Sequence, residues 1–548
     1  MLRSSQFLVP LPPTSEQPEY SMTYRTHIHD LDNDSLLQIF KCYRLEDGDN
    51  WYFRHTWRRL VHVCQRWRYL VYDLPSHLDM RLLLTNDSPS IDTLSHIPPL
   101  PLVIDYSNRT RTMAQKDEEN IHLGLQQTDR VRRVVLQAPS SSLRMWLESM
   151  NKLFPRLVDL HLLPATIEEM NLELPETLQA PDLRHLSLHG IGLPAELALL
   201  SSASTLSTLS LTHIGASCYF PPVNLLTRLR GLPHLEELSI GLAIPIPPSR
   251  EENLLPSPIT LVTLPALRRL TFQGEDVYLN NFVSQISTPL LERLSLALIF
   301  DLAFTLVNLT EFIHRTEGFE CLNAWIVFNK DSASVEAGHY DQRGIGKLIL
   351  CVNCEPLDWQ MDSITQICGA LGVFLSTAEE LTLDLNVDGM PSDWEDSLDS
   401  MMWHELLLPF IGVKRLHIGS SLTQELSQAL QSVVLELLPD LQELEVQLDV
   451  DHAKEKFSLF LKTRELVGRP VRLLTRPTPH VPRREDAKML RIPVSAPEKS
   501  PFNPKAFLKY MNYVGRSYRY QATSLISIYQ TFIQAQEQTF CSYVDLRR

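Results

Sequence analysis

The chain has 548 residues, of which 44% are hydrophobic and 21% charged, and its formal net charge is −15. This composition is ordinary for a soluble protein with a sizeable core, and the acidic balance argues against a nucleic-acid coat or a binder of anionic membranes. The 19 glycines are few for an enzyme with several phosphate loops, and eight cysteines are too sparse for a disulfide scaffold. No apolar run is long enough to span a membrane, so we predict a reduced intracellular protein that is cytoplasmic, nuclear or both.

Residues 1–25 lack the long apolar stretch of a secretory signal, and we expect them to form a disordered leader. Residues 26–85 follow as a predicted helical module. Its first apolar run is preceded by the short acceptor side chains of Asp32, Asn33 and Asp34. Such side chains cap the free N–H groups of a first helical turn, so a helix is predicted to begin there.

A second helix is predicted over residues 57–71, after a polar break. Its apolar residues recur at helical spacing, so that one face is continuously apolar. These residues are Trp57, Leu60, Val63, Cys64, Trp67, Leu70 and Val71. On periodicity alone, a small helical subdomain that packs on the rest of the chain explains the pattern.

The order of residues in this module resembles the F-box, a helical module that docks onto the adaptor Skp1 in cullin-RING ubiquitin ligases. The most telling part is the Val-Cys-x-x-Trp-Arg run that begins at Val63. The chain departs from the family at Asp32, where Pro is usual, and at Ser35, where an aliphatic residue is usual. The resemblance implies that some of the following side chains dock a Skp1-like adaptor, and through it the cullin and RING subunits, while others form the module's own core: Leu31, Leu36, Ile39, Phe40, Val63, Cys64 and Trp67.

The middle of the chain repeats the pattern apolar-x-x-apolar-x-apolar, mostly at steps of about 23 to 35 residues. The apolar positions are Val131, Val134 and Leu136; Leu157, Leu160 and Leu162; Leu183, Leu186 and Leu188; Leu206, Leu209 and Leu211; Leu235, Leu238 and Ile240; Leu267, Leu270 and Phe272; Leu291, Leu294 and Leu296; Ala378, Leu381 and Leu383; Val413, Leu416 and Ile418; and Leu441, Leu444 and Val446. Weaker strand candidates at 321–328 and 347–352 fill the one long interval, and residues 454–477 are expected to supply a last helix and strand.

Alternation within each piece predicts a strand with one buried face, and helical spacing between the pieces predicts one helix per unit. The repeat resembles an irregular leucine-rich repeat, although the family's Asn or Cys after the strand is absent. The resemblance implies an α/β fold over residues 86–476. This fold is a solenoid with parallel strands on its concave face and helices on its convex face, preceded by the small all-α module.

Residues that flank the middle leucine of each strand are predicted to point away from the core. Neighbouring parallel strands then bring them into a ladder with steps of about 4.8 Å. We predict that this concave face binds a peptide or protein target. The candidate target-facing residues are His161, His185, His189, Arg269, Arg293, Asp384 and Arg415. For any one of them, the simpler interpretation is that exposed sheet positions are polar in every solenoid.

Two clusters have the residue types of a metal or redox site without its spacing. The three histidines of the predicted face are joined by no carboxylate or cysteine at a recognisable interval. Cys351, Cys354 and Cys368 lack a fourth ligand in register. We therefore predict no metal, no cofactor and no catalytic residue, and a hydrolase or redox protein that uses the Cys351–Cys354 region is a minor alternative.

The last part of the chain differs in composition from the rest. Residues 477–500 are rich in Pro and Arg, which is typical of a linker. Residues 501–548 interleave basic and aromatic side chains in a pattern that suits single-stranded nucleic acid. An appended helix, a partner-binding segment or an incorrectly assigned coding sequence explains them more simply, so we expect no nucleic-acid partner. Residues 483–548 hold 11 Lys or Arg and 5 Asp or Glu, a net charge of +6, so the residues before them carry −21.

The acidity of this larger part favours a basic target segment. The two resemblances together imply a substrate-recognition subunit of an SCF-type (Skp1-cullin-F-box) E3 ubiquitin ligase, which is not itself an enzyme. In that role the helical module binds the Skp1-like adaptor and the repeat surface binds the target. The alternative is a leucine-rich-repeat interaction scaffold whose F-box is non-functional.

Overall fold

The computed structural model describes residues 31–45, 60–73, 81–85, 100–107, 113–165, 172–194, 198–215, 218–243, 261–299, 304, 306–339, 347–354, 357–386, 400–432 and 437–476. Four of the predicted segments lie outside these residues. They are the leader (1–25), the linker (477–500), the basic aromatic segment (501–548) and most of the connection between the two N-terminal helices.

The first described residues form two helices, α1 (Asn33–Leu45) and α3 (Gln65–Asp73). Asp32 caps α1, because its Oδ1 accepts the N–H of Ser35 at 2.7 Å. This backbone hydrogen bond lowers the pKa of the Asp32 carboxyl. The predicted helix start is confirmed.

The second predicted helix, 57–71, is interrupted by a turn before α3 begins. The turn lies at His62 and Val63, and the branched Cβ of Val63 favours a helix less than an unbranched side chain does. The Sγ atom of Cys64 then accepts the N–H of Trp67 at 3.4 Å, which satisfies one of the free donors at the start of α3. The prediction of one continuous helix was therefore wrong.

The two helices share a small core and a polar link. The rings of Phe40 and Trp67 meet edge to face with their centroids 4.7 Å apart, and both side chains are buried. Arg66 donates hydrogen bonds to the carbonyl of Leu31 at 2.6 Å and to Oδ1 of Asn33 at 2.9 Å. Apolar packing and a guanidinium bridge together hold α3 against the start of α1.

Strands and helices alternate along the rest of the described chain. The strands are β1 (Leu82–Leu84), β2 (Leu102–Tyr106), β3 (Val131–Ala138), β4 (Asp159–Pro164), β5 (His185–His189), β6 (Thr208–Ile214), β7 (Glu237–Leu242), β8 (Val262–Thr263), β9 (Arg269–Gly274), β10 (Ile286–Ser287), β11 (Arg293–Leu298), β12 (Asn323–Asn329), β13 (Ser332–Gly338), β14 (Lys347–Val352), β15 (Glu380–Leu385), β16 (Arg415–Ile418), β17 (Glu443–Val446) and β18 (Arg472–Thr475). The helices after α3 are α4 (Gln115–Gln126), α5 (Ser140–Ser149), α6 (Ala198–Ser202), α7 (Pro222–Leu229), α8 (Asp276–Val283), α9 (Val307–Arg315), α10 (Leu357–Ala370), α11 (Gly372–Leu375), α12 (Ser400–Leu407), α13 (Thr423–Ser432) and α14 (Val450–Leu466). Within the described ranges, no helix is both long enough and apolar enough to cross a membrane.

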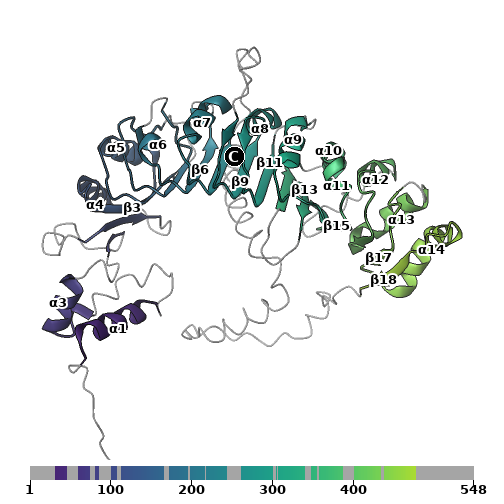
Figure 1. Cartoon of the computed structure of the whole chain (residues 1–548), viewed down its shortest axis with the longest axis horizontal. Helices are drawn as coiled ribbons and strands as arrows, with labels where there is room; N and C mark the ends of the chain where they lie inside the picture. The colour runs from purple at the N-terminus through teal and green to yellow at the C-terminus, as the bar shows by residue number, and fades with distance from the viewer. Residues whose placement is uncertain are drawn as a thin grey trace, which may run out of the picture. The chain divides into compact units, whose positions relative to one another are not determined.

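Sixteen of the described strands form one long sheet, in the order β1-β2-β3-β4-β5-β6-β7-β9-β11-β14-β13-β12-β15-β16-β17-β18. Neighbouring strands are parallel except where β13 lies between β12 and β14. Figure 1 shows the helices along one side of these strands. The predicted α/β class with parallel strands is thus confirmed as a repeat-like fold, and its sheet begins at β1, inside the range assigned to the helical module.

The leucine pattern determines which face of each strand is buried. In β5, Leu186 and Leu188 are fully buried, while the flanking Ser187 is only partly buried. Each of the ten predicted strand positions coincides with a strand of the sheet, and corresponding leucines are paired in register, for example Leu160, Leu186, Leu209 and Leu238. Rows of leucine therefore run across the sheet and form its core beneath the helices.

The interval between the seventh and eighth repeats departs from a simple stack. The weak strand candidates at 321–328 and 347–352 are confirmed as β12 and β14, but β13 between them was not predicted. Only residues 330–331 separate β12 from β13, and so short a connection permits an antiparallel pair only. The chain therefore passes from β11 to β12, returns through β13, and sets β14 beside β11, so these strands lie in reverse order.

The predicted last helix and strand are present as α14 and β18. Arg464 of α14 is fully buried, and its Nη2 lies 3.1 to 3.3 Å from three backbone carbonyls of the preceding connection, those of Leu438, Pro439 and Leu441. Burial lowers the pKa of the Arg464 guanidinium, because the charged form loses its hydration. The carbonyl contacts replace part of that hydration and fix the connection between the last repeats.

We predict that Leu209→Ala destabilises the protein by about 2–5 kcal/mol, since it removes a fully buried side chain from the leucine rows. The measurement is the shift of the urea unfolding midpoint followed by circular dichroism. Ser210→Ala, one residue along β6 on the opposite face, is the matched control and is expected to change stability by less than about 0.5 kcal/mol. Equal effects of the two substitutions would contradict this assignment of faces.

Candidate protein-binding surfaces

The predicted docking residues lie on or beside α1 and α3, which we call the helical pair. Some of these residues are buried and others are exposed. Leu36, Phe40 and Trp67 are buried within the pair or its surroundings. Ile39 and Val63 are apolar but exposed, to 43% and 58% respectively. Leu31 and Cys64 are partly buried against the core. Only a part of the predicted set is therefore accessible to a partner.

Tyr69 of α3 is a further large apolar residue of this pair that lies open to solvent, with 69% of its surface exposed. The sequence pattern did not single it out, because it falls between the apolar positions of the helical repeat. Exposed apolar side chains on helices whose other faces are buried are available for docking to another protein. Ile39, Val63 and Tyr69 are the residues exposed in this way.

The second surface is the sheet face turned away from the leucine core, which we call the polar sheet face. It consists of the outward side chains of the strands of the long sheet from β3 to β18, a set that leaves out β8 and β10, and all seven predicted target-facing residues lie on these strands. One row of this face, in register from strand to strand, is Arg133, Asp159, His185, Thr208, Glu237, Arg269, Arg293 and Lys347. Parallel pairing thus aligns charged residues that are far apart in the sequence.

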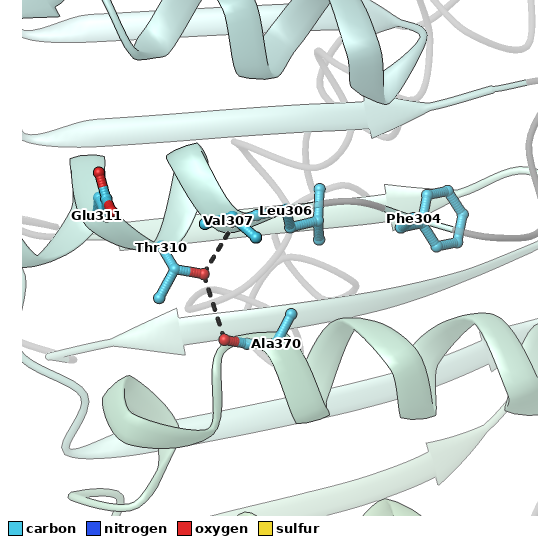
Figure 2. A pocket seen from close by; sticks show the side chains of 6 residues that line it. All are labelled: Phe304, Leu306, Val307, Thr310, Glu311 and Ala370. Atoms are coloured by element: carbon cyan, nitrogen blue, oxygen red, sulfur yellow. Dashed lines mark hydrogen bonds between the residues drawn. The ribbon is translucent and has the colours of Figure 1, made fainter.

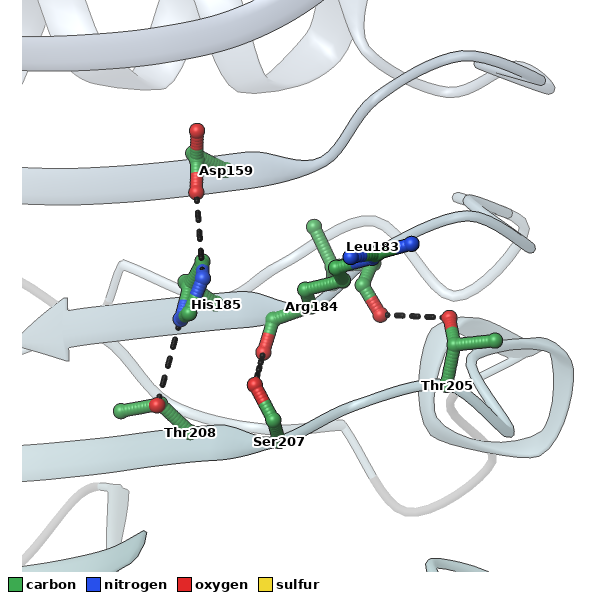
Figure 3. Close-up of polar contacts among 7 residues, drawn as sticks. All are labelled: Asp159, Leu183, Arg184, His185, Thr205, Ser207 and Thr208. Atoms are coloured by element: carbon green, nitrogen blue, oxygen red, sulfur yellow. Dashed lines mark hydrogen bonds and ion pairs between the residues drawn. The ribbon is translucent and has the colours of Figure 1, made fainter. Parts of the chain in front are cut away.

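His185 connects three neighbouring strands within this row. Its Nε2 lies 3.8 Å from Oδ1 of Asp159, and its Nδ1 lies 3.2 Å from Oγ1 of Thr208 (Figure 3). Just before β5 and β6 begin, the hydroxyl of Ser207 donates a hydrogen bond to the carbonyl of Arg184 at 3.0 Å. These contacts between successive repeats orient the outward side chains with respect to one another.

Two other histidines of the polar sheet face are partly buried. Burial lowers the pKa of His161, and the Arg133 guanidinium lowers it further, so the neutral ring is favoured. His189 accepts or donates a hydrogen bond at 3.0 Å to Thr212, and its ring stacks on that of His213 with centroids 4.9 Å apart. Burial also lowers the pKa of His213. A stacked pair of this kind is more stable when at least one ring is neutral.

Acidic and basic residues alternate across the last strands of the face. Arg415 pairs with Glu380 on the neighbouring strand, and Nδ1 of His417 lies 2.9 Å from Oε2 of Glu445. Asp384 lies close to Gly419 of the next repeat, and its Oδ1 accepts the N–H of Leu385 at 2.9 Å. Most charges at this end of the face therefore have an opposite charge or a donor beside them.

The middle of the face contains residues that the repeat pattern did not identify. Register places Ile349, Glu336 and Trp325 side by side on β14, β13 and β12. Glu336 is buried, and its carboxylate lies 2.6 Å from Nζ of Lys347. The sequence did indicate β14, through its run of strand-forming residues at 347–352. The small residues of β13 carry little strand propensity, which explains why this strand and its glutamate were missed.

The cysteine cluster lacks the properties of a nucleophile. Burial raises the pKa of the Cys351 thiol to about 12 and that of Cys354 to about 11. The thiolate that nucleophilic or redox chemistry requires is therefore disfavoured near neutral pH. Within the described ranges, no group of three or more His, Cys, Asp or Glu side chains has an arrangement that would hold a metal ion.

A pocket of about 410 Å³ lies between α9 and the end of α10. Figure 2 shows its lining, which is mostly apolar: Phe304, Leu306, Val307, Thr310, Glu311 and Ala370. The hydroxyl of Thr310 lies 3.0 Å from the carbonyl of Leu306 and 3.2 Å from that of Ala370. Its polar group is thus engaged with the backbone, and a single carboxylate supplies no acid–base pair for catalysis.

Comparison with known proteins adds no family to these observations. No model of a protein family matches the chain, and no curated protein sequence matches it.

The lowered pKa of His161 predicts a pH dependence of stability. As pH falls through about 6.5, histidine in the unfolded chain binds a proton before His161 of the folded chain does, so folding becomes less favourable. We expect wild-type protein to lose more stability than His161→Gln between about pH 7.5 and about pH 5.5 in urea titrations. His234→Gln, at an exposed position, is the control. Parallel pH profiles for wild type and His161→Gln would refute the assigned cause.

The raised thiol pKa values predict slow alkylation. At about pH 8, iodoacetamide is expected to modify Cys351 and Cys354 at least about tenfold more slowly in the folded protein than in guanidinium, where burial is lost. Peptide mass spectrometry after timed quenching measures both rates. Rapid labelling of Cys354 in the folded chain would instead indicate a reactive thiol. That result would favour the alternative of a hydrolase or redox protein that uses this region.

Proposed function

We propose that this chain is the substrate-recognition subunit of an SCF-type E3 ubiquitin ligase. In this proposal the helical pair is an F-box that binds a Skp1-like adaptor. The sheet with its helices is an irregular leucine-rich-repeat solenoid that binds the target protein. The chain makes and breaks no bond itself, and the ligase chemistry belongs to the cullin–RING assembly that the adaptor recruits.

The observation that carries the proposal is the division of the F-box-like residues into two sets. Leu36, Phe40 and Trp67 make a core that keeps the helices folded, whereas Ile39 and Val63 stay exposed. Ile39 and Val63 are also among the positions that the F-box resemblance assigns to adaptor docking, so these two exposed apolar side chains are available to a partner. This division supports docking of a partner on the helical pair.

The polar sheet face supports the second half of the proposal. Among the described residues the helices lie along one side of the long sheet (Figure 1), and on its other side outward residues of many repeats are aligned in register. Ion pairs between neighbouring strands, such as Arg415 with Glu380, hold side chains in defined positions without filling the surface. Preorganised charge of this kind gives specificity for one partner over another.

The alternative is an interaction scaffold whose F-box is non-functional. The residue that favours it is Asp32, which caps α1 at the position where the F-box family usually has Pro. Ser35 likewise supplies a polar group where the family has an aliphatic side chain, so the apolar area available to an adaptor is reduced. In this alternative the polar sheet face still binds proteins, but no ligase is recruited.

Adaptor binding is tested by co-expression of the full chain with a Skp1-like adaptor, followed by affinity capture. Val63→Glu is expected to reduce the captured adaptor at least about tenfold, since a carboxylate buried without a partner at an interface costs several kcal/mol. Ile39→Glu is expected to act in the same direction. Val450→Glu, an exposed apolar position on α14, is the matched control and should capture as much adaptor as wild type.

Exposed positions are chosen so that a loss of adaptor binding is not caused by a loss of folding. Substitutions of Leu36 or Trp67 would disrupt the core of the helical pair and abolish capture for that reason alone. Circular dichroism of the Val63 and Ile39 variants should match wild type. If wild-type chain captures no adaptor, the scaffold alternative replaces the ligase proposal.

A further inference from the structure

The reversed strands of the long sheet change the packing of the helices that cover them. Three strands, β14, β13 and β12, lie between β11 and β15. The helices of this region are α9, which follows β11, and α10, which follows β14 and packs on β13 and β14. α9 packs closely on α8, and α10 packs closely on α12, but the contact between α9 and α10 is slight. The pocket lined by residues of α9 and the end of α10 lies at this weak contact.

This pocket, of about 410 Å³, joins buried apolar surface to solvent (Figure 2). Among its lining residues, Leu306 is almost fully buried, whereas Val307 is 64% exposed and Ala370 is also exposed. Its volume lies within the range of about 300–1,000 Å³ that is typical of binding pockets. A group from outside the molecule can therefore enter it and reach apolar side chains that are otherwise buried.

Polar groups of the lining already have hydrogen-bond partners within the protein. The hydroxyl of Thr310 is shared between the carbonyls of Leu306 and Ala370, at 3.0 and 3.2 Å. The N–H of Phe304 donates to Oε1 of Gln366 on α10 at 3.2 Å. A polar occupant would lose its hydration here and gain few partners in return. The part of an occupant that enters the pocket is therefore expected to be apolar.

Glu311 adds a negative charge to the lining. It is exposed, and no cation among the described residues lies within ion-pair distance of its carboxylate. Arg315, one turn further along α9, attracts this carboxylate, but Nη2 of Arg315 donates hydrogen bonds to the carbonyls of Val283 and Ile286, the latter at 2.9 Å. The carboxylate of Glu311 thus stays available, and it favours an occupant that carries a cation beside its apolar part.

We propose that this pocket accepts a large apolar side chain of a partner protein, namely Leu, Met or Phe, next to a Lys or Arg that pairs with Glu311. Apolar anchors that fill pockets, with polar groups around them, are the usual centre of a protein interface. The exposed Val307 favours a protein over a small molecule, because the protein surface around the anchor covers this side chain as well. The acidic net charge of the chain also attracts a basic segment.

The helices lie along one side of the long sheet (Figure 1), so this pocket and the polar sheet face are on opposite sides of it. The inference therefore goes beyond the proposed function. It requires neither the adaptor on the helical pair nor a target on the polar sheet face, and it applies equally to a ligase subunit and to a scaffold.

The test selects short random peptides, displayed in many copies on phage, on the immobilised full-length protein, since multivalent display makes weak binding to one pocket measurable. Wild type is expected to enrich peptides with Leu, Met or Phe next to Lys or Arg at least about tenfold over peptides that lack the apolar residue. Ala370→Trp fills the pocket from an exposed position and should abolish this enrichment. Val277→Trp, at an exposed position on α8, is the matched control and should select as wild type does.

Glu311→Lys provides a second variant, which decides the question if Ala370→Trp does not fold. It should reduce the preference for Lys or Arg by about threefold, whereas Glu317→Lys, at an exposed position just after α9, should not. The inference is overturned if wild type enriches no such pair, if Ala370→Trp enriches it as well as wild type does, or if the Glu311 and Glu317 variants behave alike. No adaptor is present, so these outcomes are independent of the capture that tests the ligase proposal.

Discussion

Burial of an apolar face by most strands of the long sheet is the constraint from which the other features of the fold follow. The leucines of β4, β5, β6 and β7 are paired in register, so each repeat completes the core of the one before it. A slip of one residue in any strand would turn its leucines to solvent. The same constraint forces the intervening residues outward, and polar side chains thereby become aligned across many strands. The core and the polar sheet face are two results of one alternating pattern.

Much of the fold could be predicted, because the alternating leucines mark the buried positions of each strand. Leu186 and Leu188 identified a strand directly, and neighbouring repeats then implied parallel pairing. The leucine pattern cannot predict a strand whose buried positions are filled by other residues. The small residues of β13 pack in the sheet without a leucine repeat, so Glu336 and its ion pair with Lys347 emerged only from the structure. In the helical pair, periodicity marked the apolar residues, but tertiary packing decided that Phe40 is core and Val63 is surface.

Net charge and local charge differ in sign in this protein. The acidic total arises from the whole chain, yet the row at β9, β11 and β14 is basic. At physiological ionic strength charges are screened beyond about 8 Å, so a bound side chain responds to its immediate neighbours more than to the total. The total acts over longer distances and influences which proteins approach the molecule. The long-range field and the local charge environment are therefore determined by different sets of residues in this chain.

The reversed strands β14, β13 and β12 also affect how unfolding spreads along the sheet. In a stack of repeats, each unit is stabilised by its neighbours, and stability is close to a sum of nearest-neighbour terms. Within the long sheet, the repeats up to β11 are joined to those from β15 onward by this three-stranded meander. The hairpin of β12 and β13 forms from adjacent residues, whereas pairing of β11 with β14 closes a much longer loop. The meander is thus the place in the sheet where the nearest-neighbour stacking of parallel repeats is replaced by antiparallel pairing.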